Sequence, residues 1–151
     1  MYSSSTIADF FIEKAIQEKA PIGVMKVLKL VYIAHGWYLG NRAAPLINAD
    51  VEAWKDGPVI NDLYHSLKHF GLGGVNKTIG HQSSEIKNDQ DTIEFLEKIW
   101  NFYGKYTGRA LSNLTHLVDT PWHNSYDGSR YKVIPQKEIQ SYYELKVQSM
   151  K

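Results

Sequence analysis

The chain has 151 residues, of which 43% are hydrophobic and 22% are charged, a composition typical of one compact globular domain. A chain of this length buries roughly 70% of the surface that its unfolded form exposes, so its core needs no disulfide or structural metal. The absence of cysteine excludes thiolate catalysis and cysteine-ligated zinc or iron–sulfur sites. The formal charge of +1 lacks the basic excess that nucleic-acid binding requires, so we do not expect a nucleic-acid partner.

The sequence contains no predicted targeting or membrane segment. Residues 1–11 lack a charged start and a continuous apolar run, and no stretch approaches the roughly 20 apolar residues that span a bilayer. We therefore expect a cytoplasmic protein that makes no membrane contact.

Apolar periodicity predicts two helices in the first 40 residues. The first covers residues 6–19, with Ser5 as its N-cap and an apolar stripe that contains Ile7 and Phe11. The second covers residues 24–39 and ends at Gly40. Because it is apolar on more than one side, we expect this second helix to be buried at the centre of the fold.

Residues 45–59 break the helical pattern. Alternation at Val51 and Ala53, followed by a turn that contains Gly57 and Pro58, predicts a short strand or extended arm. A third helix is predicted over residues 60–70. The next segment contains four glycines and two serines within residues 71–88, and we expect a flexible loop over residues 71–90.

Most of the remaining chain is predicted to be helical, over residues 91–106, over residues 110–118, from Pro121 and from Pro135. Proline suits the first turn of a helix because its missing N–H is not needed there. The last helix is expected to run through Ile139, Tyr142, Tyr143 and Leu145. The predicted fold is therefore mainly α: residues 1–151 form a single compact helical domain, with a minor β or extended element near residues 45–59.

No catalytic motif emerges from the sequence. A dinucleotide or phosphate loop, a zinc-protease motif and a nucleophile elbow are all missing, so we expect no enzyme and no cofactor. His65 and His69 have the spacing of a helical metal pair. No third ligand can be assigned to them, so surface or capping roles are the favoured interpretation. His35, on the second helix, is interpreted as a hydrogen-bonded core histidine and not as a general base.

The four tryptophans divide into two classes. Trp37 and Trp100 lie on predicted apolar helix faces and are assigned to the core. Trp54 and Trp122 flank turns, where tryptophans are often partly exposed and can anchor a partner. Two interpretations stay open for these turns: they stabilise the fold, or they also border a partner surface. The partner-binding residues predicted on the second interpretation are Trp54, Asp56, Gly57, Pro58, Tyr64, Pro121 and Trp122.

Several ordered blocks of the chain resemble the Panacea domain, also called SocA-like, of a family earlier described among phage-associated proteins. In the first half they are KVLKLVYIAHGWYL at residues 26–39, APL at 44–46, VEAWKDGPV at 51–59 and LY at 63–64. In the second half they are LSNLTHL at 111–117, TPW at 120–122, IP at 134–135, EI at 138–139 and YY at 142–143. The resemblance runs from about residue 6 to residue 145.

This resemblance implies an antitoxin that binds and neutralises a cognate protein toxin. In the SocA branch, the antitoxin presents its bound toxin to a cytosolic AAA+ protease. The alternative function is therefore a phage or prophage adaptor that delivers a bound protein to such a protease. The family has no catalytic residues to carry over. A third alternative, a hydrolase or metal enzyme that uses the histidines, would have a bound ion or a cleft of titrating groups with perturbed pKa values.

Overall fold

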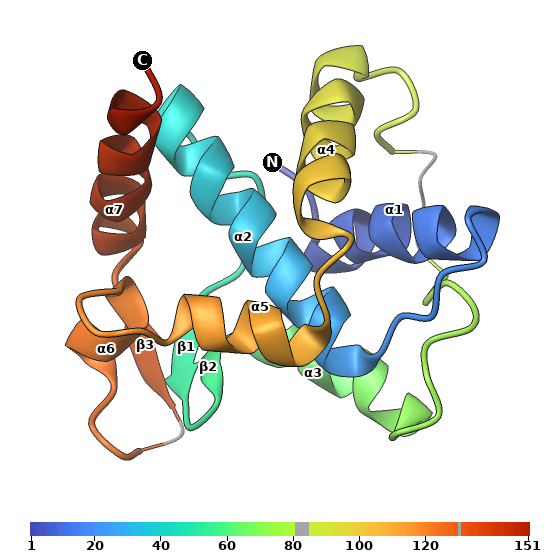
Figure 1. The fold of residues 1–151 in the computed structure, drawn as a ribbon, viewed down its shortest axis with the longest axis horizontal. Coiled ribbons are helices and arrows are strands. Elements are labelled where there is room, and N and C mark those ends of the chain that lie inside the picture. Colours follow the sequence, from blue (N-terminus) through green and yellow to red (C-terminus); the bar gives the residue numbers. More distant parts are fainter. Residues whose placement is uncertain (81–84, 130) are drawn as a thin grey trace.

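A computed structural model describes residues 1–80, 85–129 and 131–151. Within these residues the chain forms seven α-helices, one short 3-10 helix and one three-stranded sheet (Figure 1). The helices are α1 (Ser4–Gln17), α2 (Val24–Arg42), α3 (Asn61–Leu67), η1 (Lys68–Phe70), α4 (Gln90–Tyr103), α5 (Gly108–Thr115), α6 (Pro121–Ser125) and α7 (Gln136–Ser149). The prediction of a mainly α fold with a minor β element is confirmed.

Helix α2 is the centre of the fold, as its apolar pattern predicts. It contacts α1, α3, α4, α5, α7 and strand β2 (Gly57–Val59), and Figure 1 shows it crossing the middle of the molecule. Its side chains are buried on every side, including Val27, Leu30, Val31, Ile33 and Leu39. A helix that is apolar all round is stable in water only when other elements cover it completely.

The predicted end of α2 at Gly40 is wrong, because the helix continues to Arg42. Ala43, with a φ of 52°, takes the left-handed conformation that ends it. Gly40 instead allows close packing, since a Cβ built there would lie 2.7 Å from the backbone carbonyl carbon of Tyr143 in α7. The glycine is therefore needed for contact between two helices and not for a helix end.

Other helix boundaries also differ from the prediction. The N-cap of α1 is Ser3 and not Ser5, because the Ser3 hydroxyl accepts a hydrogen bond from the Thr6 N–H at 3.2 Å. Helix α4 ends at Tyr103 and not at residue 106, and α5 begins after its cap Thr107 and ends at Thr115. Helix α7 includes Leu145, as predicted, and the side chain of this residue is exposed.

The sheet combines a local hairpin with a distant strand. Strand β1 (Val51–Trp54) pairs antiparallel with β2, placing Trp54 opposite Gly57. On its other edge β1 pairs antiparallel with β3 (Lys132–Ile134), placing Val51 opposite Ile134. The sequence predicted the hairpin region but not β3. A three-residue strand carries too short a pattern to be recognised, and it forms only because β1 offers an unpaired edge.

The predicted loop over residues 71–90 is attached to the helices at several points. The Val75 N–H donates to the Ile22 carbonyl at 2.7 Å, and the Ile79 N–H donates to Asp9 Oδ1 at 2.8 Å. The side chains of Val75 and Ile86 are buried. Residues 81–84 of this loop lie outside the described residues, and its flexibility stays a prediction. Among the helices that the structure describes, none is both long enough and apolar enough to cross a membrane.

Candidate partner-binding site

The two turn tryptophans predicted from the sequence are in direct contact. The indole N–H of Trp122 donates a hydrogen bond to the main-chain carbonyl of Trp54. Thr120 caps α6, and Pro121 begins it, as predicted. The ring of Trp122 then lies nearly parallel to the ring of Tyr126, with 4.8 Å between the ring centroids. Trp122 is only 9% exposed, so the expectation of a partly exposed side chain is wrong for this residue. Its ring packs behind the hairpin and supports it.

Trp54 has the half-buried position expected of an anchor. Its indole N–H donates to Glu52 Oε1 at 2.9 Å, and its ring packs edge-on against Tyr64 of α3 at 5.1 Å. This contact joins the first strand of the hairpin to the following helix. The two aromatic side chains therefore form one wall, built from segments only ten residues apart.

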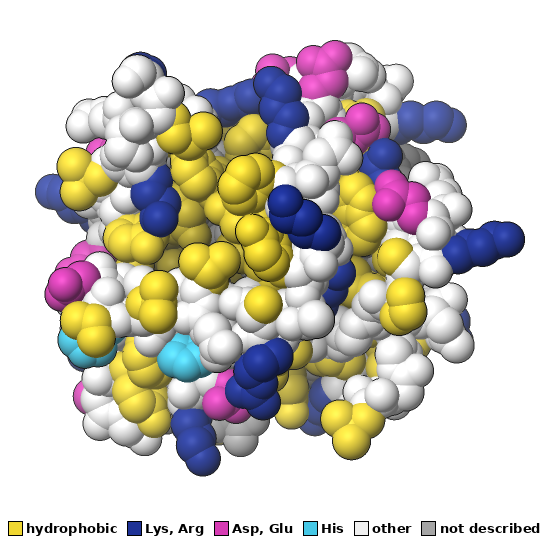
Figure 2. All heavy atoms as spheres, viewed as in Figure 1, with side chains coloured by type: hydrophobic (Ala, Val, Ile, Leu, Met, Phe, Trp, Pro, Cys, Tyr) yellow, Lys and Arg dark blue, Asp and Glu magenta, His cyan; other side chains and the backbone are white. Residues whose placement is uncertain are grey.

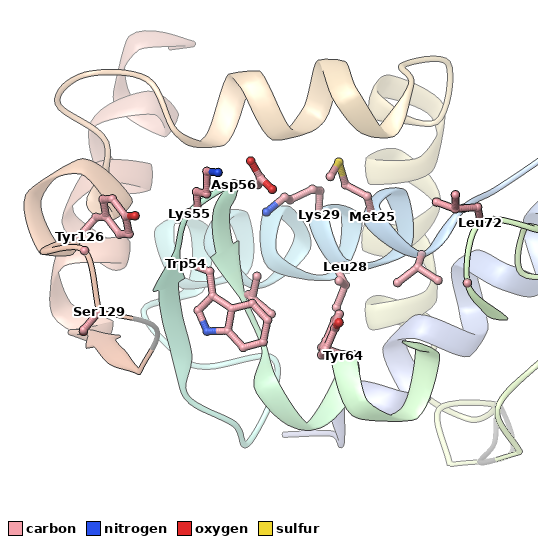
Figure 3. A pocket seen from close by; sticks show the side chains of 15 residues that line it. Met25, Leu28, Lys29, Trp54, Lys55, Asp56, Tyr64, Leu72, Tyr126 and Ser129 are labelled. Carbon is pink, nitrogen blue, oxygen red and sulfur yellow. The ribbon is translucent and has the colours of Figure 1, made fainter. Parts of the chain in front are cut away.

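This wall borders a cavity of about 610 Å³ between the hairpin, α2 and α3 (Figure 3). Three of the predicted partner-binding residues line it, namely Trp54, Asp56 and Tyr64. The other four, Gly57, Pro58, Pro121 and Trp122, do not line it and are buried. The remaining lining is largely apolar and comes from α2, from the exposed Leu72 and from the segment after α6, with Val24, Met25, Leu28 and Tyr126 as its main side chains.

The cavity also contains a buried cation that the sequence analysis did not identify. Lys29 of α2 is only 2% exposed, and its Nζ donates a hydrogen bond to the Pro58 carbonyl at 2.9 Å. Burial lowers the pKa of this lysine to about 8, although the nearby Asp56 carboxylate acts in the opposite direction. The sequence did contain a signal for this cation, because Lys29 lies in the middle of a helix that is otherwise predicted to be buried.

Gly57 provides the space for Lys29. Its φ of 120° is unfavourable for residues with a side chain, and a Cβ there would lie 2.8 Å from Lys29 Nζ. The adjoining turn is held by α5, because the Ser112 hydroxyl donates to the Asp56 carbonyl at 2.7 Å. The hairpin is thus positioned by contacts with α2, α5 and α6 together.

A second hollowed surface lies between α4 and α7 and was not predicted. It is a groove of about 580 Å³ whose lining includes Trp37, Ile99, Phe102, Tyr103 and Met150. Figure 2 shows hydrophobic side chains gathered across this face, with Lys and Arg side chains around them. Phe102 is 60% exposed. Trp37, assigned to the core, is only half-buried, and its indole N–H donates to the Tyr103 hydroxyl at 2.8 Å. Trp100 is buried as predicted.

No histidine that the structure describes belongs to a cluster of three or more metal-binding side chains. His65 and His69 are exposed, and the described part of the chain contains no group of three or more metal-binding side chains. His35 is a core residue, as predicted, with 1% exposure. The prediction that it is hydrogen-bonded is wrong for Nδ1, which has no partner among the described residues. Burial lowers the pKa of His35 to about 4, so the ring is neutral near pH 7.

Comparisons with known proteins identify the family of this chain. The family model described as "Antitoxin SocA-like, Panacea domain" matches residues 27–123, a range that contains most of α2, the whole hairpin and most of the residues that line the cavity. The protein named antitoxin SocA, from Caulobacter vibrioides (strain NA1000 / CB15N), is 30% identical over 124 residues, which are 77% of this chain and 66% of that protein. The match therefore spans just under two thirds of that relative's length. No solved structure matches the chain. Because this family model matches more than half of its residues, the chain belongs to the SocA-like antitoxin family and contains the Panacea domain.

Proposed function

We propose that this protein is an antitoxin that binds a cognate protein toxin directly and neutralises it by forming a stoichiometric complex in the cytoplasm. Its family and the name of its relative support an antitoxin role. Direct binding is supported by the open, largely apolar cavity at the hairpin. Three of the seven partner-binding residues predicted from the sequence line this cavity.

The composition of this cavity suits recognition of another protein. Recognition pockets are mostly apolar and aromatic, with a few polar groups that orient the ligand. Here Trp54 and Tyr64 provide rigid aromatic area, and the charged groups are Lys29, Lys55 and Asp56. Aromatic side chains lose little conformational entropy on binding and are enriched among the residues that dominate interface energies. We therefore assign Trp54 and Tyr64 as the main contacts for the toxin.

The experiment is a co-expression assay with the toxin encoded beside this protein's gene. Trp54→Ala and Tyr64→Ala should each reduce rescue of growth, because truncation of such anchors commonly costs about 2 kcal/mol or more of binding free energy. Phe102→Ala is the matched control, since it removes an exposed aromatic ring from the groove between α4 and α7. Circular dichroism and thermal unfolding of each purified variant should establish that it is folded.

Full rescue by a folded double variant, Trp54→Ala with Tyr64→Ala, would contradict the proposed surface. Loss of rescue in Phe102→Ala alone would instead place the toxin in the groove. The assay should also be repeated in a strain that lacks the AAA+ protease. Rescue that persists there supports direct neutralisation, whereas rescue that disappears supports delivery of the toxin for proteolysis.

A further inference from the structure

We infer that the cavity at the hairpin binds a carboxylate attached to an apolar group, with the ammonium of Lys29 as its counter-charge. The inference rests on the proposed function, because it names the part of the toxin that this site recognises: an acidic side chain that lies beside apolar atoms of the toxin.

The first argument is the incomplete pairing of Lys29. An ammonium has three N–H donors, and within the described residues the Lys29 Nζ makes one hydrogen bond, to the Pro58 carbonyl. Neither Asp56 nor any other carboxylate among those residues forms an ion pair with it. A buried charge without a partner of opposite sign is costly, and proteins normally provide one. Lys29 thus has donors for which the described residues supply no acceptor.

The second argument is where this ammonium lies. The Lys29 side chain is part of the lining of the cavity, and Figure 3 shows it between Asp56 and the aromatic wall that contains Trp54. Gly57 makes room for Nζ on the hairpin side, because a Cβ there would lie 2.8 Å from it. Since the hairpin occupies that side of Nζ, a carboxylate would approach the ammonium from the cavity, which Lys29 helps to line.

The third argument concerns the rest of the ligand. Leu28, Val59 and Tyr64 line the same cavity and have little polar surface to offer. An apolar group attached to the carboxylate would be buried against them, which adds hydrophobic stabilisation to the charge interaction. Because burial lowers the pKa of Lys29 despite the presence of Asp56, the attraction from Asp56 does not offset the desolvation of the ammonium. A carboxylate in the cavity would supply the missing compensation.

The test uses the full chain without toxin and two probes of nearly equal shape, 3-phenylpropionate and its neutral amide, 3-phenylpropanamide. Binding is followed by the shifts of backbone amide signals of residues that line the cavity, in ¹H–¹⁵N nuclear magnetic resonance spectra. We expect the wild-type chain to bind the acid about tenfold more tightly than the amide, as is reasonable for one charge-assisted hydrogen bond. Lys29→Met should abolish this preference while binding of the amide stays the same.

Asp56→Asn keeps the test decisive if Lys29→Met does not fold. Asp56 is exposed and its side chain is not part of the core, so this variant should fold. Removal of its negative charge should strengthen binding of the acid about two- to fivefold and leave binding of the amide unchanged, because the acid is then no longer repelled.

Equal affinity for the acid and the amide in the wild-type chain would overturn the inference. The same conclusion would follow from an acid preference that survives Lys29→Met, or from no shift at cavity residues with either probe. Because this assay contains no toxin, these results leave the co-expression assay unaffected. An antitoxin whose Trp54 is needed for rescue but whose cavity does not prefer the acid would keep the proposed function and lose this inference.

Discussion

Gly36 of α2 lies directly against the ring of Tyr143 of α7. A Cβ built at position 36 would lie 2.2 Å from Cε2 of that ring. Tyr143 is buried, and the rings of Tyr32 and Trp37 surround it at 6.4 Å and 5.4 Å. The tyrosine therefore has no space into which it can move, and the absence of a side chain at position 36 sets the approach of the two helices.

Gly36→Ala should destabilise the protein by about 1–3 kcal/mol, the usual cost of an extra group in a packed core. Alanine is better than glycine in a helix by roughly 1 kcal/mol, so a neutral or stabilising outcome would show that Tyr143 can move aside. Urea denaturation measures the difference. Gly73→Ala is the control, because its Cβ would meet only the Phe70 carbonyl oxygen, at an ordinary 3.6 Å.

His35 should make the stability of the protein depend on pH. Burial lowers its pKa to about 4 from 6.5, so between these values the unfolded chain binds a proton that the folded chain does not. The stability contributed by neutral His35 is therefore fully present above pH 6.5 and is lost as the pH falls toward 4. His35→Gln should reduce the slope of unfolding free energy against pH in this window. The exposed His65→Gln should leave the slope unchanged, and equal slopes in all three proteins would contradict the prediction.

Trp122→Phe should weaken the attachment of the hairpin. The substitution keeps an aromatic ring but removes the indole N–H that donates to the Trp54 carbonyl. The substitution therefore removes one hydrogen bond between α6 and the hairpin, which contributes about 0.5–1.5 kcal/mol to stability. Thermal unfolding should show a lower midpoint, and hydrogen exchange should show faster exchange in β1 and β2. Asn124→Ala, on the exposed side of α6, serves as control, and unchanged exchange in Trp122→Phe would disprove the supporting role.

His65 and His69 should bind no functional metal. Both imidazoles are exposed, and no third metal-binding side chain joins them within the described residues. Elemental analysis of protein purified without a histidine tag should find zinc, iron and manganese far below one ion per chain. A double variant, His65→Ala with His69→Ala, should also rescue growth as well as the wild type. Near-stoichiometric metal that the double variant loses would reverse this conclusion.

Neutralisation should follow the molar ratio of antitoxin to toxin. If the fraction of toxin that is bound sets the effect, the toxin activity of a purified mixture should fall linearly as antitoxin is added. It should reach its minimum at a fixed molar ratio near one. Titration of the toxin's activity against measured concentrations of both proteins checks this. Complete neutralisation at a small fraction of one antitoxin per toxin would require turnover, and would therefore contradict a stoichiometric mechanism.

Local pattern in the sequence was enough for the main features of the fold. Apolar residues on several sides of residues 24–39 can be covered only at the centre of a globule, which is where α2 lies. Thr120 and Pro121 begin a helix because capping and a fixed φ act within one turn. The site was partly predictable for the same reason: Trp54, Asp56 and Tyr64 lie within eleven residues, and a hairpin followed by a helix brings them to one cavity.

Contacts between distant segments were decided only by the tertiary structure. The sequence suggested Gly40 as a helix end, whereas the structure shows that Gly36 and Gly40 both make room for Tyr143, more than 100 residues away in the chain. Lys29 becomes a cavity cation only because Gly57, on the hairpin, leaves room for its ammonium. Propensity and periodicity act over a few residues, whereas close packing depends on which surfaces meet, and residue types alone do not specify that pairing.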